Sequence, residues 1–146
     1  MISLKRAYDP TSPADGKRYL VERLWPRGLT KASLPLAGWL KAVAPSAGLR
    51  QWFSHDPDKW QEFRTRYFAE LRKDPDAWGP LLSAARRGRV TLVYSSRDTK
   101  HNAAVALKDF LEAALEQKRP PSGRKNRRRS PYQFPPNGSR RKGIED

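Results

Sequence analysis

The chain has 146 residues, the length of one domain, and a formal net charge of +15 at pH 7. It contains no cysteine, which excludes disulfides, zinc–thiolate sites and thiol catalysis. No apolar run approaches the roughly 20 residues that span a bilayer, and the first residues lack the apolar stretch of a signal peptide. We therefore expect a cytoplasmic protein that makes no membrane contact.

The positive charge divides the chain into two parts. Residues 1–116 hold twenty Lys/Arg and thirteen Asp/Glu, whereas residues 118–146 hold ten Lys/Arg and two Asp/Glu. The second part is also rich in proline and nearly free of aliphatic side chains, so it buries too little apolar surface to offset chain entropy. We predict an α/β domain over residues 1–117 and a disordered Arg/Pro-rich basic tail over residues 118–146.

The first elements in chain order are two strands. Residues 2–8 alternate weakly in polarity and predict a strand. Residues 9–16, "DPTSPADG", are dense in turn formers and predict a loop. Residues 18–25 predict a second strand, which Pro26 and Gly28 end.

Helices are predicted in the middle of the chain. Residues 36–43 carry apolar side chains at i, i+3, i+4 and i+7, the spacing of a helix, and residues 46–53 predict another short helical segment. Asp56 and Asp74 each precede a proline and predict the N-caps of two longer amphipathic helices. Gly88 is predicted as the left-handed residue that ends the second of these.

The last elements are a strand and a helix. Residues 90–94, "VTLVY", form a nearly unbroken apolar and β-branched run, which is typical of a parallel strand buried on both faces. A final helix is predicted over residues 99–117, with Asp98 or Thr99 as its N-cap. The order strand, loop, strand, helices, strand, helix favours a small layered α/β fold with an at least partly parallel sheet.

Three arginines are candidates for an anion site beyond the strand ends, where open α/β sheets bind ligands. Arg23 is predicted on the second strand, on the face of Trp25, whereas Arg27 and Arg97 belong to the two strand-end loops. Guanidinium groups bind phosphate or carboxylate through two parallel hydrogen bonds. Alternatively, the three arginines form structural ion pairs with carboxylates, for which the candidates are Glu22, Asp9 and Asp98.

His101 is the candidate for proton transfer. It opens the last helix, whose N-terminus attracts anions, so it is expected either to hold a phosphate or to act as a general acid or base. Asn102 and Tyr94 would orient it, and Trp25 would form the wall of the pocket. A nucleophilic Ser95 lacks the glycine-flanked turn of hydrolases. Glu22 and Asp98 could form a Mg²⁺ or acid–base site, but ion pairing with the neighbouring arginines is the more expected role for both. The chain has two histidines without metal-site spacing and no Gly-rich phosphate loop, so we expect neither a metal nor a cofactor.

Several segments resemble a known family. They are "VERLWPRG", "WLKAVAPS", "LRQWFSHDPDKWQEFRTRYFAEL" and "VTLVYSSRDTKHNAAVALKDFL". In this order they are similar to the bacterial domain-of-unknown-function family 488, in its YeaO-like branch, over roughly residues 2–115. The resemblance implies a small cytoplasmic α/β protein and no particular reaction. The family pattern usually has Asp where this chain has Glu22, and often has Gly where it has Ser54.

The sequence leaves several functions open. The first is a pocket, with or without enzymatic activity, for a phosphorylated or nucleotide-like small molecule. The second is a non-catalytic module that binds nucleic acid without sequence specificity, through residues 118–142 and the basic domain surface, by release of counterions. The basic tail can also be a solubilising extension. A third function is an interaction domain with a vestigial pocket. The oligomeric state is not indicated.

Overall fold

The computed structural model describes residues 1–118 and has a four-stranded sheet in which every pairing is parallel. The strands are β1 (Ile2–Arg6), β2 (Lys17–Leu20), β3 (Gly38–Trp39) and β4 (Val90–Tyr94). Their spatial order is β1-β4-β2-β3, so β4 is flanked by β1 and β2. The register aligns Val90 with both Ile2 of β1 and Lys17 of β2. The predicted α/β fold class is confirmed.

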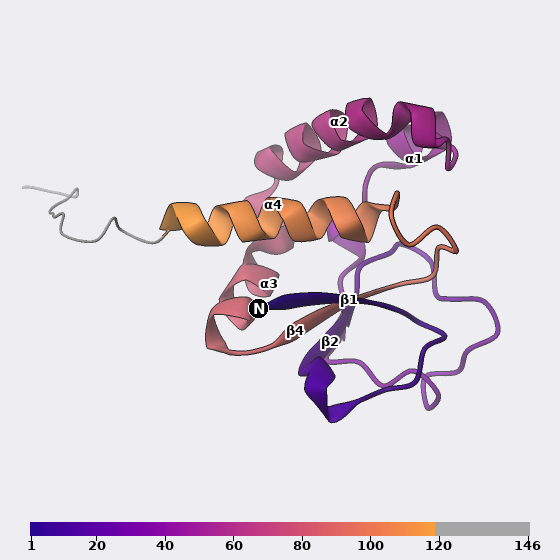
Figure 1. The fold of residues 1–146 in the computed structure, drawn as a ribbon, viewed down its shortest axis with the longest axis vertical. Coiled ribbons are helices and arrows are strands. Elements are labelled where there is room, and N and C mark those ends of the chain that lie inside the picture. Colours follow the sequence, from indigo (N-terminus) through magenta and orange to yellow (C-terminus); the bar gives the residue numbers. More distant parts are fainter. Residues whose placement is uncertain (119–146) are drawn as a thin grey trace, which may run out of the picture. The chain divides into compact units, whose positions relative to one another are not determined.

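The helices cover one face of this sheet (Figure 1). They are α1 (Ala47–Phe53), α2 (Trp60–Lys73), α3 (Pro75–Arg87) and α4 (Ala103–Lys118). Leu92 of β4 packs in the larger hydrophobic cluster, to which these helices contribute Phe53, Phe63, Leu81 and Leu107. No helix in residues 1–118 has the length and apolar character needed to cross a membrane.

Loops and one 3₁₀ turn lie over the other face. Val93, the neighbour of Leu92, packs there in a smaller cluster with Leu20 and Leu34. Asp15, in the turn Pro13–Asp15, accepts a hydrogen bond on its backbone oxygen from the Thr91 hydroxyl at 2.7 Å. All five residues of β4 are buried, as predicted, although helices cover one face and loops the other.

Four predicted elements differ from the structure. The first strand ends at Arg6 rather than at residue 8, and the last helix begins at Ala103 rather than at residue 99, so His101 lies before that helix and does not open it. The second strand ends at Leu20 rather than at residue 25, because the chain turns away after a last backbone bond from Val21 N to Val93 O. The predicted helix over residues 36–43 is instead β3 followed by the 3₁₀ turn Lys41–Val43. Its backbone N–H groups bond to β2, with Ala37 N donating to Arg18 O and Leu40 N to Leu20 O. The N–H groups that a helix would use for its own hydrogen bonds thus donate to β2.

The helix ends agree with the sequence only in part. Asp56 accepts a hydrogen bond from Asp58 N at 3.0 Å, but it caps the 3₁₀ turn Pro57–Lys59, and α2 begins after this turn without a side-chain cap. Asp74 makes no capping bond although α3 begins at Pro75. Gly88 is not left-handed, since its φ of 173° is extended backbone. Asn102, rather than Asp98 or Thr99, caps α4 by accepting a 3.0 Å bond from Val105 N. Apart from Lys118, the predicted disordered tail lies outside the described residues.

Candidate functional site

The loops that follow β2 and β4 meet beyond the carboxyl ends of these strands. The Glu22 carboxylate joins them, because it accepts hydrogen bonds from Ser95 Oγ at 2.7 Å and from Ser95 N at 3.1 Å. The expected pairing of Glu22 with the neighbouring arginines is not found within residues 1–117. Glu22 therefore serves as the structural acceptor that links the two loops.

The end of β1 adds a third segment to this region. The Arg6 guanidinium donates from Nε to Ser96 O at 2.9 Å and from Nη2 to Ser95 O at 3.2 Å. It also lies over the Tyr8 ring, and the Tyr8 hydroxyl donates to Arg27 O at 2.8 Å. These contacts connect residues 6–8, 22–28 and 95–101, which we call the strand-end surface.

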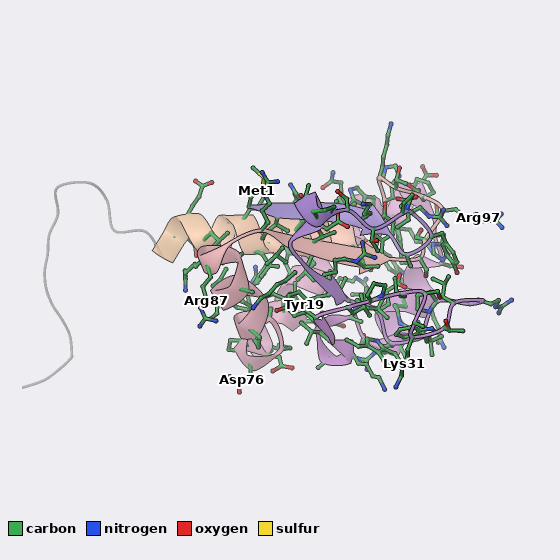
Figure 2. All side chains as sticks on the ribbon, turned by 90° about the horizontal axis from the view of Figure 1, so that it is seen from below. Met1, Tyr19, Lys31, Asp76, Arg87 and Arg97 are labelled. Carbon is green, nitrogen blue, oxygen red and sulfur yellow. The ribbon has the colours of Figure 1, made fainter. Side chains whose placement is uncertain are left out.

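Arg23, Arg27 and Arg97 are all exposed on the strand-end surface. Arg23 donates from Nε to Pro45 O at 3.3 Å, and it does not lie on a strand face because β2 ends at Leu20. Within residues 1–117, none of the three guanidiniums has a carboxylate within 4.0 Å. Figure 2 shows Arg97 projecting from the same end of the domain as Lys31, away from Arg87. The alternative of structural ion pairs is thus not observed, and anion binding stays a prediction.

The loop after β4 is held in place by its own polar groups. The Asp98 carboxylate accepts bonds from Lys100 N and His101 N, each at 2.9 Å. These two backbone bonds are the main reason that the pKa of Asp98 lies below its ordinary value. The Asn102 side chain adds a 2.7 Å bond to Asp98 O. The loop is therefore fixed before any ligand arrives.

His101 forms a pair with Asp98. Its Nδ1 lies 3.1 Å from Asp98 Oδ2, and its ring meets that of Trp60 edge-on, with centroids 5.4 Å apart. The His101 side chain is 34% exposed. Because Nδ1 faces Asp98, Nε2 is the atom left for a ligand or a proton. In the described part of the chain Ser95 bonds to Glu22 and not to His101, so no Ser–His nucleophile pair is assembled.

The other predicted site residues take part in folding. Tyr94 is 4% exposed, and burial raises its pKa, with a smaller contribution in the same direction from Asp9. Asn102 is the buried cap of α4. Trp25 donates from Nε1 to Leu29 O at 2.6 Å and packs edge-on against Trp39 in the smaller cluster. Their roles in orienting His101 and lining a pocket stay predictions.

A buried ionic cluster on the loop-covered face was not found by sequence reasoning. The Asp15 carboxylate accepts bonds from Arg18 Nη1 at 2.7 Å and from Lys5 Nζ at 3.0 Å. Burial alone would raise the pKa of Asp15, but hydrogen bonds from Lys5 and Arg18 outweigh it and lower the pKa. Arg18 Nη2 is buried without a hydrogen-bond partner. The only signal in the sequence is the i, i+3 spacing of Asp15 and Arg18 around Gly16. Within residues 1–118, no three His, Asp or Glu side chains gather as metal ligands.

Comparison with known proteins identifies the family. Residues 1–134 match the family described as "Inactive DUF488-N3 subclade". The chain belongs to the DUF488 family. "Uncharacterized protein YeaO" of Escherichia coli (strain K12) is 40% identical over 112 residues, which cover 77% of this chain and 97% of that protein.

Two further relatives are mycobacterial. "Uncharacterized protein Rv3073c" of Mycobacterium tuberculosis (strain ATCC 25618 / H37Rv) is 37% identical over 110 residues, which cover 75% of this chain and 92% of that protein. "Uncharacterized protein Mb3100c" of Mycobacterium bovis (strain ATCC BAA-935 / AF2122/97) has the same identity and coverage. No solved structure matches the chain. The resemblance predicted from the sequence motifs is confirmed.

Proposed function

We propose that this DUF488 chain is a non-catalytic module that binds a phosphorylated or nucleotide-like anion at the strand-end surface. One observation carries the proposal: three exposed guanidiniums, those of Arg23, Arg27 and Arg97, have no carboxylate partner within residues 1–117. The nearby carboxylates of Glu22 and Asp98 already accept bonds from their own loops. Unpaired guanidiniums on fixed loops are suited to an incoming anion.

Binding without turnover is favoured over enzymatic activity. An enzymatic role would use His101 Nε2 as a base, yet the nearby Ser95 hydroxyl donates to Glu22 and gives no activated nucleophile. The description of the matching subclade as inactive supports the same preference. The expected behaviour is saturable anion binding with no chemical change in the ligand.

The test compares three versions of the full-length protein. They are the wild type, the double variant Arg27→Ala/Arg97→Ala and the control Arg72→Ala, which removes an exposed arginine at the far end of α2 from His101. Calorimetric titration with inorganic pyrophosphate and with ADP, in about 150 mM salt, measures the Kd. The double variant should bind at least about tenfold more weakly, a loss of about 1.4 kcal/mol, and the control should match the wild type. Equal affinities in all three proteins would refute the proposal.

Binding of nucleic acid is the second candidate function, and a separate basic cluster favours it. Lys17, Arg86, Arg87 and Arg89 are exposed at the end of the sheet opposite the strand-end surface. Lys17 N donates to Arg89 O at 3.0 Å, which holds these two residues side by side. Clustered cations of this kind suit phosphate backbones rather than bases. The contribution predicted for residues 118–142 lies outside the described residues, apart from Lys118.

A further inference from the structure

Leu24 is an apolar side chain that the fold leaves in water. It is 71% exposed, and within residues 1–117 the other large apolar side chains that are exposed are Met1 and Tyr8. Tyr8 belongs to the same strand-end surface and bonds through its hydroxyl to Arg27 O. A single exposed leucine is ordinary on a protein surface. What distinguishes Leu24 is the way its loop is held.

The loop is anchored on both sides of Leu24. Before it, Glu22 bonds to Ser95, and its backbone oxygen accepts a 2.6 Å bond from Trp39 Nε1. After it, Trp25 bonds to Leu29 O, and Pro26 is buried. The loop therefore holds Leu24 in one place without using its side chain. A surface loop that is ordered before binding loses little conformational entropy when a partner arrives.

We propose that the strand-end surface is a docking site for an acidic protein segment. The segment would cover Leu24 and Tyr8 with an apolar side chain and present Asp or Glu carboxylates to Arg27 and Arg97. This inference rests on the proposed function, since the same arginines provide the anion affinity, and it adds the carboxylates of a protein segment to the anions that they bind. Tyrosine and arginine are also the residues that protein interfaces favour as energetic centres.

The chemistry of the surface favours protein over nucleic acid. Leucine has no ring on which a base can stack. One face of the Tyr8 ring is taken by the Arg6 guanidinium, which lies 5.1 Å from the ring centroid, and the Tyr8 hydroxyl donates to Arg27 O, so at most one ring face is left for a partner. A second copy of this chain is an unsuitable partner for the same surface, because residues 1–116 carry twenty Lys/Arg against thirteen Asp/Glu. Charge complementarity therefore selects an acidic partner.

The test uses a random peptide library displayed on phage, selected against the full-length protein and counter-selected against the full-length Leu24→Asp variant. The enriched peptides should share a large apolar residue flanked by Asp or Glu. A synthetic consensus peptide should bind Leu24→Ala and Arg27→Ala/Arg97→Ala at least about tenfold more weakly than the wild type, and Arg72→Ala equally well. Leu24→Ala should have the melting temperature of the wild type, since the side chain has no packing role. It should also keep the affinity of the wild type for pyrophosphate.

The outcomes separate this inference from the proposed function. If no selected peptide loses affinity when Leu24 is replaced, or if the consensus peptide binds Leu24→Ala with full affinity, the docking site is refuted. This holds whether or not the protein binds pyrophosphate. If pyrophosphate binding is absent but the peptide still requires Leu24 and the arginines, the docking site stands and the small-anion function fails. A single-stranded oligonucleotide that needs Leu24 and displaces the peptide would assign the surface to nucleic acid and overturn the inference.

Discussion

At the residue scale, the turn after α1 contains two strained residues. Ser54 and His55 both adopt positive φ, 47° and 56°, where a side chain meets its own backbone. Left-handed backbone costs a non-glycine residue about 1–2 kcal/mol, and glycine avoids this cost. The glycine that the family pattern often has at the position of Ser54 is therefore explained by conformation. His55 packs its ring near Phe53, with centroids 6.4 Å apart, which agrees with a structural role.

The variant Ser54→Gly should be more stable than the wild type. Relief of the positive φ should exceed the added entropy of the unfolded chain and raise the free energy of unfolding by about 0.5–1 kcal/mol. Urea denaturation followed by circular dichroism measures the change. Ser46→Gly is the matched control: Ser46 caps α1 by accepting a bond from Leu49 N, so this substitution should give no gain. A less stable Ser54→Gly protein would contradict the assignment of strain.

Acid should destabilise the fold partly through Asp98. Its folded-state pKa lies below the ordinary value of 3.8, so the charged carboxylate adds stability above that pH. This contribution is lost as the pH falls through the lowered value. Between about pH 5 and pH 2.5, Asp98→Asn should therefore lose less stability to urea than the wild type does. If the free energy of unfolding falls equally with pH in both proteins, the hydrogen bonds in the loop do not lower the pKa of Asp98, and the prediction is wrong.

At the element scale, the sequence predicted those elements whose pattern is local. The buried strand β4 and the helices α2 and α3 follow from composition and spacing. The segment 36–43 did not, because its backbone donors are taken by β2, a partner distant in sequence. The helical spacing of its apolar residues arises there from a short strand and a 3₁₀ turn.

The candidate site was likewise predicted where it depends on local sequence and missed where it depends on contacts between distant segments. Arg27 and Arg97 were correctly placed in loops that follow strands, although the end of β2 lies five residues before the predicted end at residue 25. The bond from Ser95 to Glu22 and the pair of Asp15 with Arg18 depend on the order of strands in space, which no local pattern encodes. The cap at Asn102, four residues beyond Asp98, was missed because Asp98 itself accepts bonds from Lys100 N and His101 N as an N-cap does, although α4 begins only at Ala103.

Removal of the cap should weaken α4. Asn102→Ala leaves the N–H of Val105 without its acceptor and should lower the free energy of unfolding by about 0.5–2 kcal/mol. Asn102→Asp keeps an acceptor oxygen and should retain most of the stability. Guanidinium denaturation of the two variants provides the measurement, and equal losses in both would argue that the Asn102 Nδ2 bond to Asp98 O, rather than the cap, is what matters.

At the scale of the whole molecule, positive charge lies at both ends of the sheet. The strand-end surface carries Arg23, Arg27 and Arg97, which have no carboxylate partner within residues 1–117, and the cluster of Lys17, Arg86, Arg87 and Arg89 lies beyond the opposite strand ends. The two regions are suited to different ligands. The strand-end surface combines fixed loops with an exposed leucine, whereas the opposite cluster combines its charges with the exposed Met1, whose sulfur lies 3.9 Å from Arg89 Nη1.

The salt dependence of binding to duplex DNA should show whether the cluster of Lys17, Arg86, Arg87 and Arg89 contacts nucleic acid. If the cluster contributes to binding, the logarithm of the association constant falls linearly as the logarithm of salt concentration rises. The variant Lys17→Ala/Arg89→Ala should then make this negative slope shallower by about two. Fluorescence anisotropy with a labelled duplex gives the slope. Leu24→Ala should leave it unchanged. A slope unaffected by Lys17→Ala/Arg89→Ala would exclude these two residues from the DNA contact.

The position of β4 has a consequence for how the chain assembles during synthesis. β1 and β2 do not pair with each other, and both pair with β4, which follows α3 in the sequence. A nascent chain that stops before residue 90 therefore has both flanking strands and no strand between them. The sheet is complete only when the central strand has been synthesised. Because β4 is distant in sequence from both β1 and β2, these pairings are long-range and slow to form. Until then the inner edges of β1 and β2 are open, and translation must reach Tyr94 before the domain has a complete sheet.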